Sequence, residues 1–409
     1  MPLFSIMIIN KKTKNNIIAF ICVMLFLIKL KFYDVVNFVG ESVRMAYVGS
    51  YQDIGFGSRL FVGSIIRLFT DYVPQSLIIK ITITIVILIY LIVAFALKKL
   101  LDMYESYTDI LIAIFLMFIC WPMGSLFYNV WAGFIDTICL FLYIISIIML
   151  CSKNKIIKEL SIILVMMSIA SHTMPFFMFS AMYFIVLLHR LYLEKNDFKY
   201  VLYNFLLRAI PIFLLLFFFQ FYKKINFSDA YSMEQFLINK SDAYSWADFL
   251  QYEYFTTIIE NAIHHHSNAH MKLHIAAFFT YLFNLPIFIM FLRLWHGCAI
   301  ESKDKNEKII YMCCFLSFIP TIVCHIATDY MRWNESYFLV NFAVLVYFLL
   351  VKNELVCKRI FGLEKLLKKY RIIYILILIV LLIFNINPKN SYAYNGLIYD
   401  IVGCFYNGY

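Results

Sequence analysis

The residues best suited to chemistry lie in a polar segment near the N-terminus, residues 39–75. It contains Asp53, followed by Arg59 and Arg67. A carboxylate can accept a proton, and guanidinium groups bind phosphate oxygens through paired N–H donors. From Arg59 onward, polar residues recur at helical spacing among apolar ones, which predicts an amphipathic helix lying in a membrane interface. The two arginines would then face one way and bind an anionic headgroup or a diphosphate, or they would simply anchor the helix to lipid phosphates.

A second group of polar residues follows late in the chain and consists of His325, Asp329, Arg332, Trp333 and Glu335. Ionisable residues at a membrane edge are costly, so this density indicates a functional site. We expect His325 and Asp329 to be candidate bases. We expect Arg332 to bind phosphate or a sugar acid, Trp333 to stack on a sugar ring, and Glu335 to bind substrate or serve as a base. The alternative is a turn in an aromatic belt with a local Asp–Arg pair.

Two further polar residues, Asp136 and His172, stand alone in otherwise apolar runs. A single histidine inside a membrane is more often hydrogen-bonded packing than catalysis, so neither residue is informative by itself. The pattern of spans nevertheless predicts that both reach the same depth, on the same side, as the two polar groups. His172 is therefore counted among the expected substrate-binding residues.

The elements that must position these residues are membrane helices. The chain is 63% hydrophobic and only 15% charged, which excludes an ordinary soluble domain. Its net charge of +10 lies largely in short lysine-rich connections beside apolar runs. Lysine collects in cytoplasmic loops, so topology explains the charge and no nucleic-acid partner is implied.

The sequence predicts an all-α fold, in which residues 1–409 form a single transmembrane domain, a polytopic bundle of about 11 helices (roughly 10 to 12). The N-terminus is expected in the cytoplasm and the C-terminus outside. Two longer loops with interfacial helices are expected on the outer face, residues 39–75 and 223–272. The expected spans are residues 17–38, 76–97, 109–124, 134–150, 160–176, 177–191, 201–222, 273–294, 309–328, 337–351 and 372–384.

The long loop contains features that suggest other chemistry. His266, His270 and His274 share one helical face, which could bind a metal, but only Glu260 lies near them and such stripes also suit a wet interface. We therefore predict no metal and no other cofactor. The pentapeptide Ser-Asp-Ala-Tyr-Ser occurs at residues 228–232 and 241–245 and would suit sugar hydroxyls and rings. The sequence contains no phosphate-binding Gly-Lys-Ser/Thr loop, which argues against nucleotide hydrolysis.

The chain resembles the Wzy-type O-antigen and capsule repeat-unit polymerases of bacteria and, more broadly, the GT-C membrane glycosyltransferases. The resemblance rests on the number of spans and on the first outer loop, which holds Asp53 and an interfacial arginine helix. It rests also on the long outer loop in mid-chain and on Asp329-Tyr-Met-Arg332-Trp333 late in the sequence. It covers the whole chain in outline.

The resemblance implies roles for individual residues. GT-C enzymes use a carboxylate of the first outer loop as base, a role that Asp53 matches best and Glu41 second best. Wzy-type polymerases engage the lipid diphosphate with arginines of their outer loops. Arg59, Arg67 and Arg332 fit that role.

The resemblance further implies a multi-pass glycosyltransferase of the bacterial inner membrane, active on its outer face in O-antigen, capsule or exopolysaccharide synthesis. Its substrate would be an oligosaccharide repeat unit on a polyprenyl diphosphate. Because that leaving group is already activated, neither a nucleotide nor a metal is needed. The other implied partners are membrane lipids and the chain-length regulator and flippase of the same pathway. The alternatives are a lipid-linked oligosaccharide flippase, another polysaccharide transporter, or a membrane scaffold.

Overall fold

The structure is a computed structural model, and it describes residues 13–21, 24, 41–120, 135–242, 250–255, 271–323 and 330–376. The described part is mostly helical, at 84%, with one sheet of two short strands, so the expected all-α class is confirmed. Within these residues, three helices are long and apolar enough to cross a membrane by length and composition, and four if one bent helix pair counts as a span. The larger expected number, about 11, stays a prediction.

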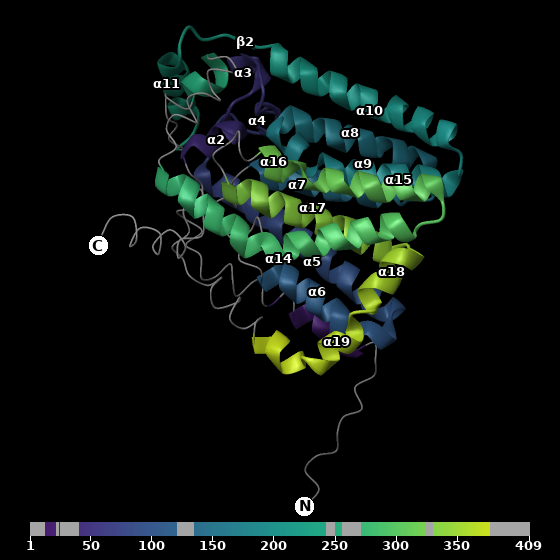
Figure 1. The fold of residues 1–409 in the computed structure, drawn as a ribbon. Helices are drawn as coiled ribbons and strands as arrows, with labels where there is room; N and C mark the ends of the chain where they lie inside the picture. Colours follow the sequence, from purple (N-terminus) through teal and green to yellow (C-terminus); the bar gives the residue numbers. More distant parts are fainter. Residues whose placement is uncertain are drawn as a thin grey trace, which may run out of the picture.

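The elements follow one another along the chain and are labelled as in Figure 1. They are α2 (Glu41–Val48), α3 (Tyr51–Ile54), β1 (Gly55–Phe56), α4 (Phe61–Arg67), α5 (Gln75–Met103), η2 (Glu105–Tyr107), α6 (Thr108–Cys120), α7 (Ile135–Leu150), α8 (Lys155–Ser171), α9 (Met174–Glu194), α10 (Phe198–Phe221), β2 (Lys224–Ile225), α11 (Ala230–Lys240), η4 (Gln251–Phe255), α14 (Met271–Glu301), α15 (Lys305–Cys313), η5 (Cys314–Phe318), α16 (Ile319–Val323), α17 (Tyr330–Leu350), α18 (Glu354–Phe361) and α19 (Glu364–Lys369).

The long helices form a bundle with α9 at its centre. α9 packs against α7, α8, α10, α15 and α17, and 72% of its apolar stretch is buried, against 28% for α5 and 22% for α10. A helix that is apolar all round belongs in a core. α5 and α10 instead turn large apolar side chains outward, among them Phe95, Leu214 and Phe217. Such an exposed apolar surface suits lipid rather than water.

Four helices of the bundle begin with the same capping chemistry. The side chains of Asn154, Asp197, Asp304 and Asn353 accept hydrogen bonds from backbone N–H groups in the first turns of α8, α10, α15 and α18, respectively. Such caps satisfy donors that have no partner within the helix, and each is worth about 1 kcal/mol. These four capping residues lie in the short, lysine-rich connections between helices.

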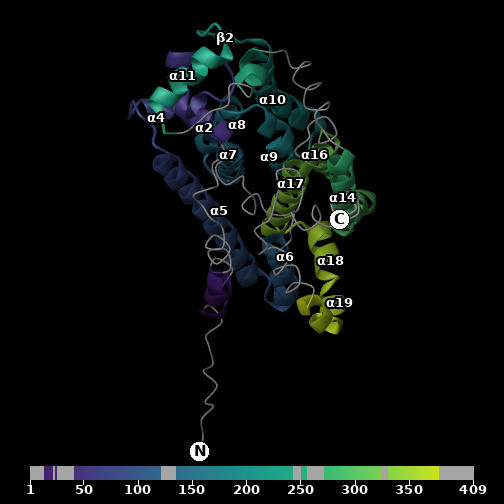
Figure 2. The same ribbon diagram turned by 90° about the vertical axis from the view of Figure 1, so that its left-hand side faces the viewer.

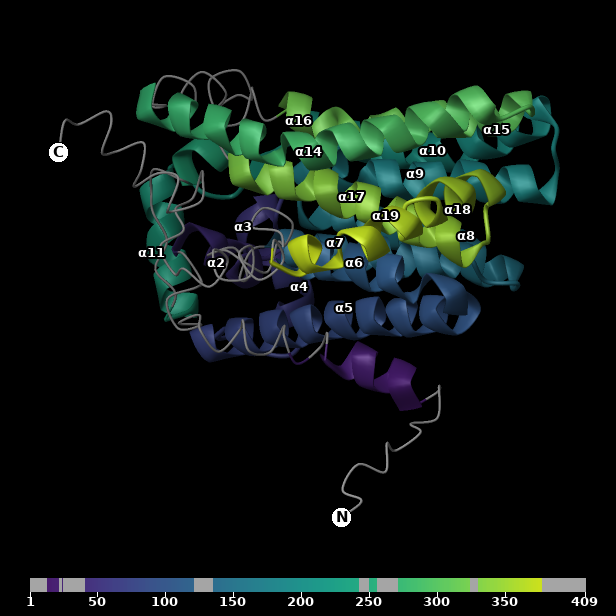
Figure 3. The same cartoon turned by 60° about the horizontal axis from the view of Figure 1, so that its bottom comes forward.

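A second, smaller core lies at the opposite end of the bundle, and we call this unit the cap. It consists of α2, α3, β1 and α4 from the first loop and of β2, α11 and η4 from the long loop. Its buried side chains include Tyr47, Ile54, Leu60, Met233 and Leu237. Figure 3 shows α2, α3 and α11 at the left-hand end of the helices, and Figure 2 shows α4, α11 and β2 above the bundle.

Backbone pairing joins the two loops of the cap. β1 and β2 are antiparallel, with Gly55 opposite Ile225 and Phe56 opposite Lys224. The Val73 N–H donates to the Lys240 carbonyl at 2.9 Å. The sequence predicted both loops on one side of the membrane but not that they pair. Strands of two residues have no detectable periodicity, so the pattern carried no signal for them.

Two expected helix boundaries differ from the structure. In the expected span 309–328, the described residues 309–323 do not form one straight helix, because α15 passes into the 3₁₀ turn η5 before α16 begins. At this break Ser317 Oγ donates to Asn341 Oδ1 at 2.8 Å, and the same oxygen accepts from Trp295 Nε1 at 2.7 Å. The expected turn at 329–336 is also largely helical, since α17 begins at Tyr330.

Candidate functional site

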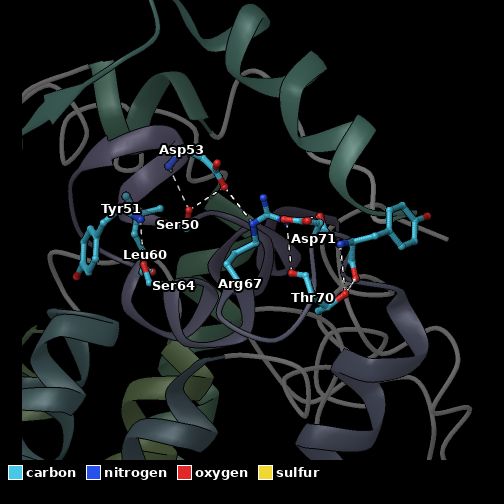
Figure 4. A network of polar contacts seen from close by, with 9 residues as sticks. Ser50, Tyr51, Asp53, Leu60, Ser64, Arg67, Thr70 and Asp71 are labelled. Atoms are coloured by element: carbon cyan, nitrogen blue, oxygen red, sulfur yellow. Dashed lines mark hydrogen bonds and ion pairs between the residues drawn. The ribbon is translucent and has the colours of Figure 1, made fainter.

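A polar network centred on Asp53 and Arg67 occupies the cap (Figure 4). Arg67 Nε donates to Asp53 Oδ2 at 3.1 Å, and Ser50 Oγ donates to the same oxygen at 2.8 Å. The two charged side chains are only 18% and 11% exposed. None of the described residues donates a hydrogen bond to Asp53 Oδ1. The carboxylate is therefore held through one oxygen, while the other can accept a proton from a bound molecule.

The local sequence fixes this carboxylate in three ways. Ser50 is the N-cap of α3 and accepts a hydrogen bond from the Asp53 N–H at 3.2 Å. Gly55 ends α3 at φ +105°, a conformation that favours glycine, and a Cβ there would overlap the Lys224 carbonyl oxygen. A Cβ at Gly63 would overlap the Gly49 carbonyl oxygen, so only glycine lets α4 lie directly against the start of α3.

Arg67 also contacts the end of its own helix. Its Nη1 donates to the backbone oxygens of Thr70 and Asp71 and forms an ion pair with Asp71 Oδ1 at 3.2 Å. The Asp71 side chain is 93% exposed, so solvent screens this second pair. A phosphate that displaced Asp71 would meet an arginine already oriented by Asp53.

Arg59 does not share a helix with Arg67. The expected interfacial helix is present as α4, over seven residues, but it begins at Phe61. Arg59 lies before it with φ +66°, a left-handed conformation that costs about 1 kcal/mol or more for a residue with a side chain. The two arginines therefore do not lie on one helical face, contrary to the prediction from the sequence.

Asp136 and His172 form a buried pair beneath the cap. Asp136 lies in the first turn of α7, and His172 is the C-cap of α8. His172 Nε2 lies 3.9 Å from Asp136 Oδ1, with side-chain exposures of 3% and 1%. That distance is too long for a hydrogen bond but allows an ion pair with a protonated imidazole. Tyr47 of α2 is fully buried in the same core as Ile135 and Cys139, the α7 residues on either side of Asp136.

Of the residues expected to converge, Asp53, Arg59, Arg67, Asp136 and His172 lie at one end of the described part; the convergence with His325, Asp329 and Arg332 stays a prediction. The buried core of the cap includes Ile135 and Cys139 of α7, on either side of Asp136. The Tyr51 hydroxyl donates to the Ala170 carbonyl, two residues before His172, at 3.5 Å. Two polar centres, one in the cap and one under it, belong to one region.

The second polar group expected from the sequence, residues 325–335, is described only in part. His325 and Asp329 lie outside the described residues, and of Arg332 and Glu335 only the helical backbone is described. The Trp333 side chain is 0% exposed and lies in the bundle core. None of the described residues accepts a hydrogen bond from its Nε1. A ring buried in this way does not present a face to a sugar, so the expected stacking platform is not seen at Trp333.

Features of the long loop are structural where they are described. Asp229, in the first copy of the repeated pentapeptide, is the N-cap of α11, and hydrogen bonds from Ser232 and Ser228 hold its pKa below the usual range. Asp242, in the second copy, accepts a hydrogen bond from the Gln75 N–H at 2.6 Å. Histidines 264–266 and 270 lie outside the described residues, and the described part of the chain contains no group of metal-ligating side chains.

Sequence reasoning missed three participants in the site. Asp71 was not recognised as a partner of Arg67, and Tyr47 and Cys139 were not recognised as members of the buried core beside Asp136. The spacing of four residues between Arg67 and Asp71 was a usable signal, since a chain that continues a helical turn brings such pairs together. Nothing in the sequence indicated that α2 would share a buried core with α7.

No protein family, curated protein or solved structure matches this chain. The class of the molecule therefore follows from its own fold and site: an α-helical protein with a few helices long and apolar enough to span a membrane and a polar cap at one end of the bundle.

Proposed function

We propose that the protein is a membrane glycosyltransferase that polymerises or transfers oligosaccharide repeat units carried on polyprenyl diphosphate. The observation that supports this most is the Asp53–Arg67 pair, in a cap at one end of an apolar bundle. Transfer from a diphosphate needs a base for the acceptor hydroxyl and cations for the departing phosphates. The pair combines an oriented carboxylate with a guanidinium group.

In the proposed reaction, an acceptor hydroxyl oxygen forms a bond to the anomeric carbon of the donor. The bond from that carbon to the diphosphate oxygen breaks, and the diphosphate leaves with the bonding electrons. The hydroxyl proton passes to Asp53 Oδ1. Arg67 and Arg59 stabilise the negative charge that develops on the diphosphate. His325, Asp329, His172, Arg332 and Glu335 are further candidates for acid–base or substrate contacts.

The proposed setting is the bacterial inner membrane, crossed by about 11 helices. The cap belongs to the periplasmic face, together with the C-terminus, while the N-terminus and the short capped connections belong to the cytoplasm. Two features favour this orientation. The lysine-rich connections lie opposite the cap, and lysine collects on the cytoplasmic side. The cap is built from the two longest loops between apolar runs.

The test is complementation of a strain that lacks the protein. Wild type should restore long-chain surface polysaccharide, and Asp53→Asn should abolish it, because the amide keeps the shape of the side chain but cannot take the proton. Asp71→Asn is the matched control: it changes an exposed carboxylate on the same arginine and should leave polymer length unchanged. Purified wild type should also convert lipid-linked repeat units into longer chains. Normal polymer with Asp53→Asn would contradict Asp53 as the base, and failure of wild type in both assays would contradict the function.

A lipid-linked oligosaccharide flippase is the alternative, and the buried Asp136–His172 pair favours it. Transporters place ionisable residues inside the bundle, where they mark the path of the substrate. Loss of a flippase traps lipid-linked repeat units in the inner leaflet, whereas loss of a polymerase leaves single units in the outer leaflet. Labelling those units from the outside of intact spheroplasts distinguishes the two.

A further inference from the structure

The end of the bundle opposite the cap has a surface, formed by α18 and α19, that takes no part in the proposed reaction. After α17 the chain bends by 108° into α18 and α19. The bend begins at Lys352, whose φ of +59° is left-handed, and Asn353 caps α18. If α17 crosses the bilayer, α18 and α19 therefore run nearly parallel to its surface. Figures 1 and 2 show both helices below the bundle, away from α11.

Carboxylates fix this helix pair to the bundle. Glu301, the last residue of α14, forms ion pairs with Lys358 at 3.1 Å and Arg359 at 2.7 Å. Glu364 of α19 is buried and accepts a hydrogen bond from the Ile110 N–H in the first turn of α6 at 2.9 Å. The Tyr107 ring stacks on Phe361 with centroids 4.1 Å apart. The pair is thus a docked part of the fold.

The side of the pair that faces away from these contacts is both basic and apolar. Residues 352–371 contain seven Lys and Arg against two Glu, and those two carboxylates are Glu354 and the docked Glu364. The exposed cations include Lys365, Lys369 and Arg371, and also Lys368, which forms an ion pair with Glu364 at 3.0 Å. Among them lie exposed apolar side chains, with Leu366 at 56%, Tyr370 at 44% and Leu363 at 41%.

Basic and apolar side chains interleaved on one short helix characterise helices that lie in a membrane interface. Lysines bind the phosphates of anionic lipids there, while the apolar side chains enter the acyl boundary. Exposure of Leu366 and Tyr370 to water alone would be unfavourable. Burial of the lysines among acyl chains alone would be unfavourable as well.

We propose that α18 and α19 form a binding surface for anionic phospholipid in the leaflet opposite the cap. The choice of an anionic lipid follows from charge complementarity, with phosphate headgroups binding Lys365, Lys369 and Arg371. The surface is independent of the cap and of the reaction proposed there.

The test uses the purified full-length protein in nanodiscs of phosphatidylcholine, with or without phosphatidylglycerol. Phosphatidylglycerol should raise the thermal unfolding midpoint of wild type, because a ligand that binds the folded state stabilises it. Lys365→Gln/Lys369→Gln should lose most of this shift. In a lipid titration followed by native mass spectrometry, the affinity for phosphatidylglycerol should fall roughly fivefold for each lysine removed.

The matched control is Lys223→Gln/Lys224→Gln, which removes two lysines at the cap end and should keep the full shift. Lys365→Arg/Lys369→Arg, which keeps the charge, should keep it as well. Three outcomes would overturn the proposal: an equal effect of both lipids on wild type, an unchanged shift in Lys365→Gln/Lys369→Gln, or an equal stabilisation by inorganic phosphate alone. The last would indicate a site for free phosphate rather than a lipid surface.

Discussion

The bundle and the cap are held together in different ways. In the bundle, neighbouring helices are joined by short connections with asparagine or aspartate caps, and large rings such as Trp295, Tyr311 and Phe348 fill a continuous core. The cap joins segments more than 150 residues apart, through two-residue strands and single hydrogen bonds. The bundle supplies rigidity, and the cap, which carries the Asp53–Arg67 pair, is the part that can open at lower cost.

The largest expected effect tests whether the cap is a separate unit of stability. Gly63→Ala places a methyl group against the Gly49 backbone, which cannot move aside, and overpacking of this kind costs about 1–3 kcal/mol. We expect faster proteolysis within residues 41–73 and an unchanged thermal midpoint for the bundle.

Gly297→Ala is the matched control in the bundle. There the added methyl group meets the guanidinium end of Arg359, a flexible side chain that can swing away, so the cost should be smaller. If Gly63→Ala unfolded cap and bundle together in one transition, the division into two units would be wrong.

The second prediction concerns the ion pair within the cap. Arg67→Ala leaves the partly buried Asp53 carboxylate without its cation and should destabilise the cap by roughly 2 kcal/mol. Asp71→Asn, which removes the exposed partner, should cost less than about 0.5 kcal/mol. Hydrogen exchange in α3 and α4 measures both values, and a double-mutant cycle with Asp53→Asn isolates the coupling between Asp53 and Arg67. Equal costs for the two variants would place the coupling on Asp71 instead.

The third prediction compares two aspartates that are N-cap residues of helices, Asp229 of α11 in the cap and Asp197 of α10 in the bundle. Hydrogen bonds from Ser232 and Ser228 lower the pKa of Asp229 in the cap, and hydrogen bonding to Lys195 lowers that of Asp197 in the bundle. A carboxyl group whose pKa is lower when folded stabilises the fold above its unfolded pKa and loses that contribution as pH falls through the folded value. Acidification below pH ~4 should therefore fray α11, while α10 stays closed because the bundle packs it.

Hydrogen exchange of the first turns of α11 and α10, followed from neutral to acidic pH, checks this difference. Asp229→Ala should remove the pH dependence of α11 and make its exchange fast throughout. Equal protection of α11 and α10 in acid would mean that packing of the cap matches that of the bundle.

The sequence predicted the bundle better than the site, for a physical reason. Runs of apolar residues dictate helices wherever they occur, so α5, α9 and α10 follow from composition alone. The ends of helices depend on single side chains, so α17 began earlier than expected. The residue types of the cap indicated its chemistry, but the Gly55–Ile225 register and the burial of Tyr47 in one core with Cys139 depend on long-range packing, which no local pattern encodes.

The smallest expected effect concerns Trp333 of the bundle, whose side chain has a buried hydrogen-bond donor. Its Nε1 has no acceptor among the described residues, and a buried donor without a partner destabilises a fold. Trp333→Phe removes that donor along with some ring volume, so the two effects oppose each other and stability should change by less than about 1 kcal/mol. Thermal unfolding of the purified variant measures this, and polymer length in the complemented strain should match wild type. A large loss of polymer with unchanged stability would mean that α17 moves to expose the ring to a sugar, and the bundle would then belong to the active region as much as the cap does.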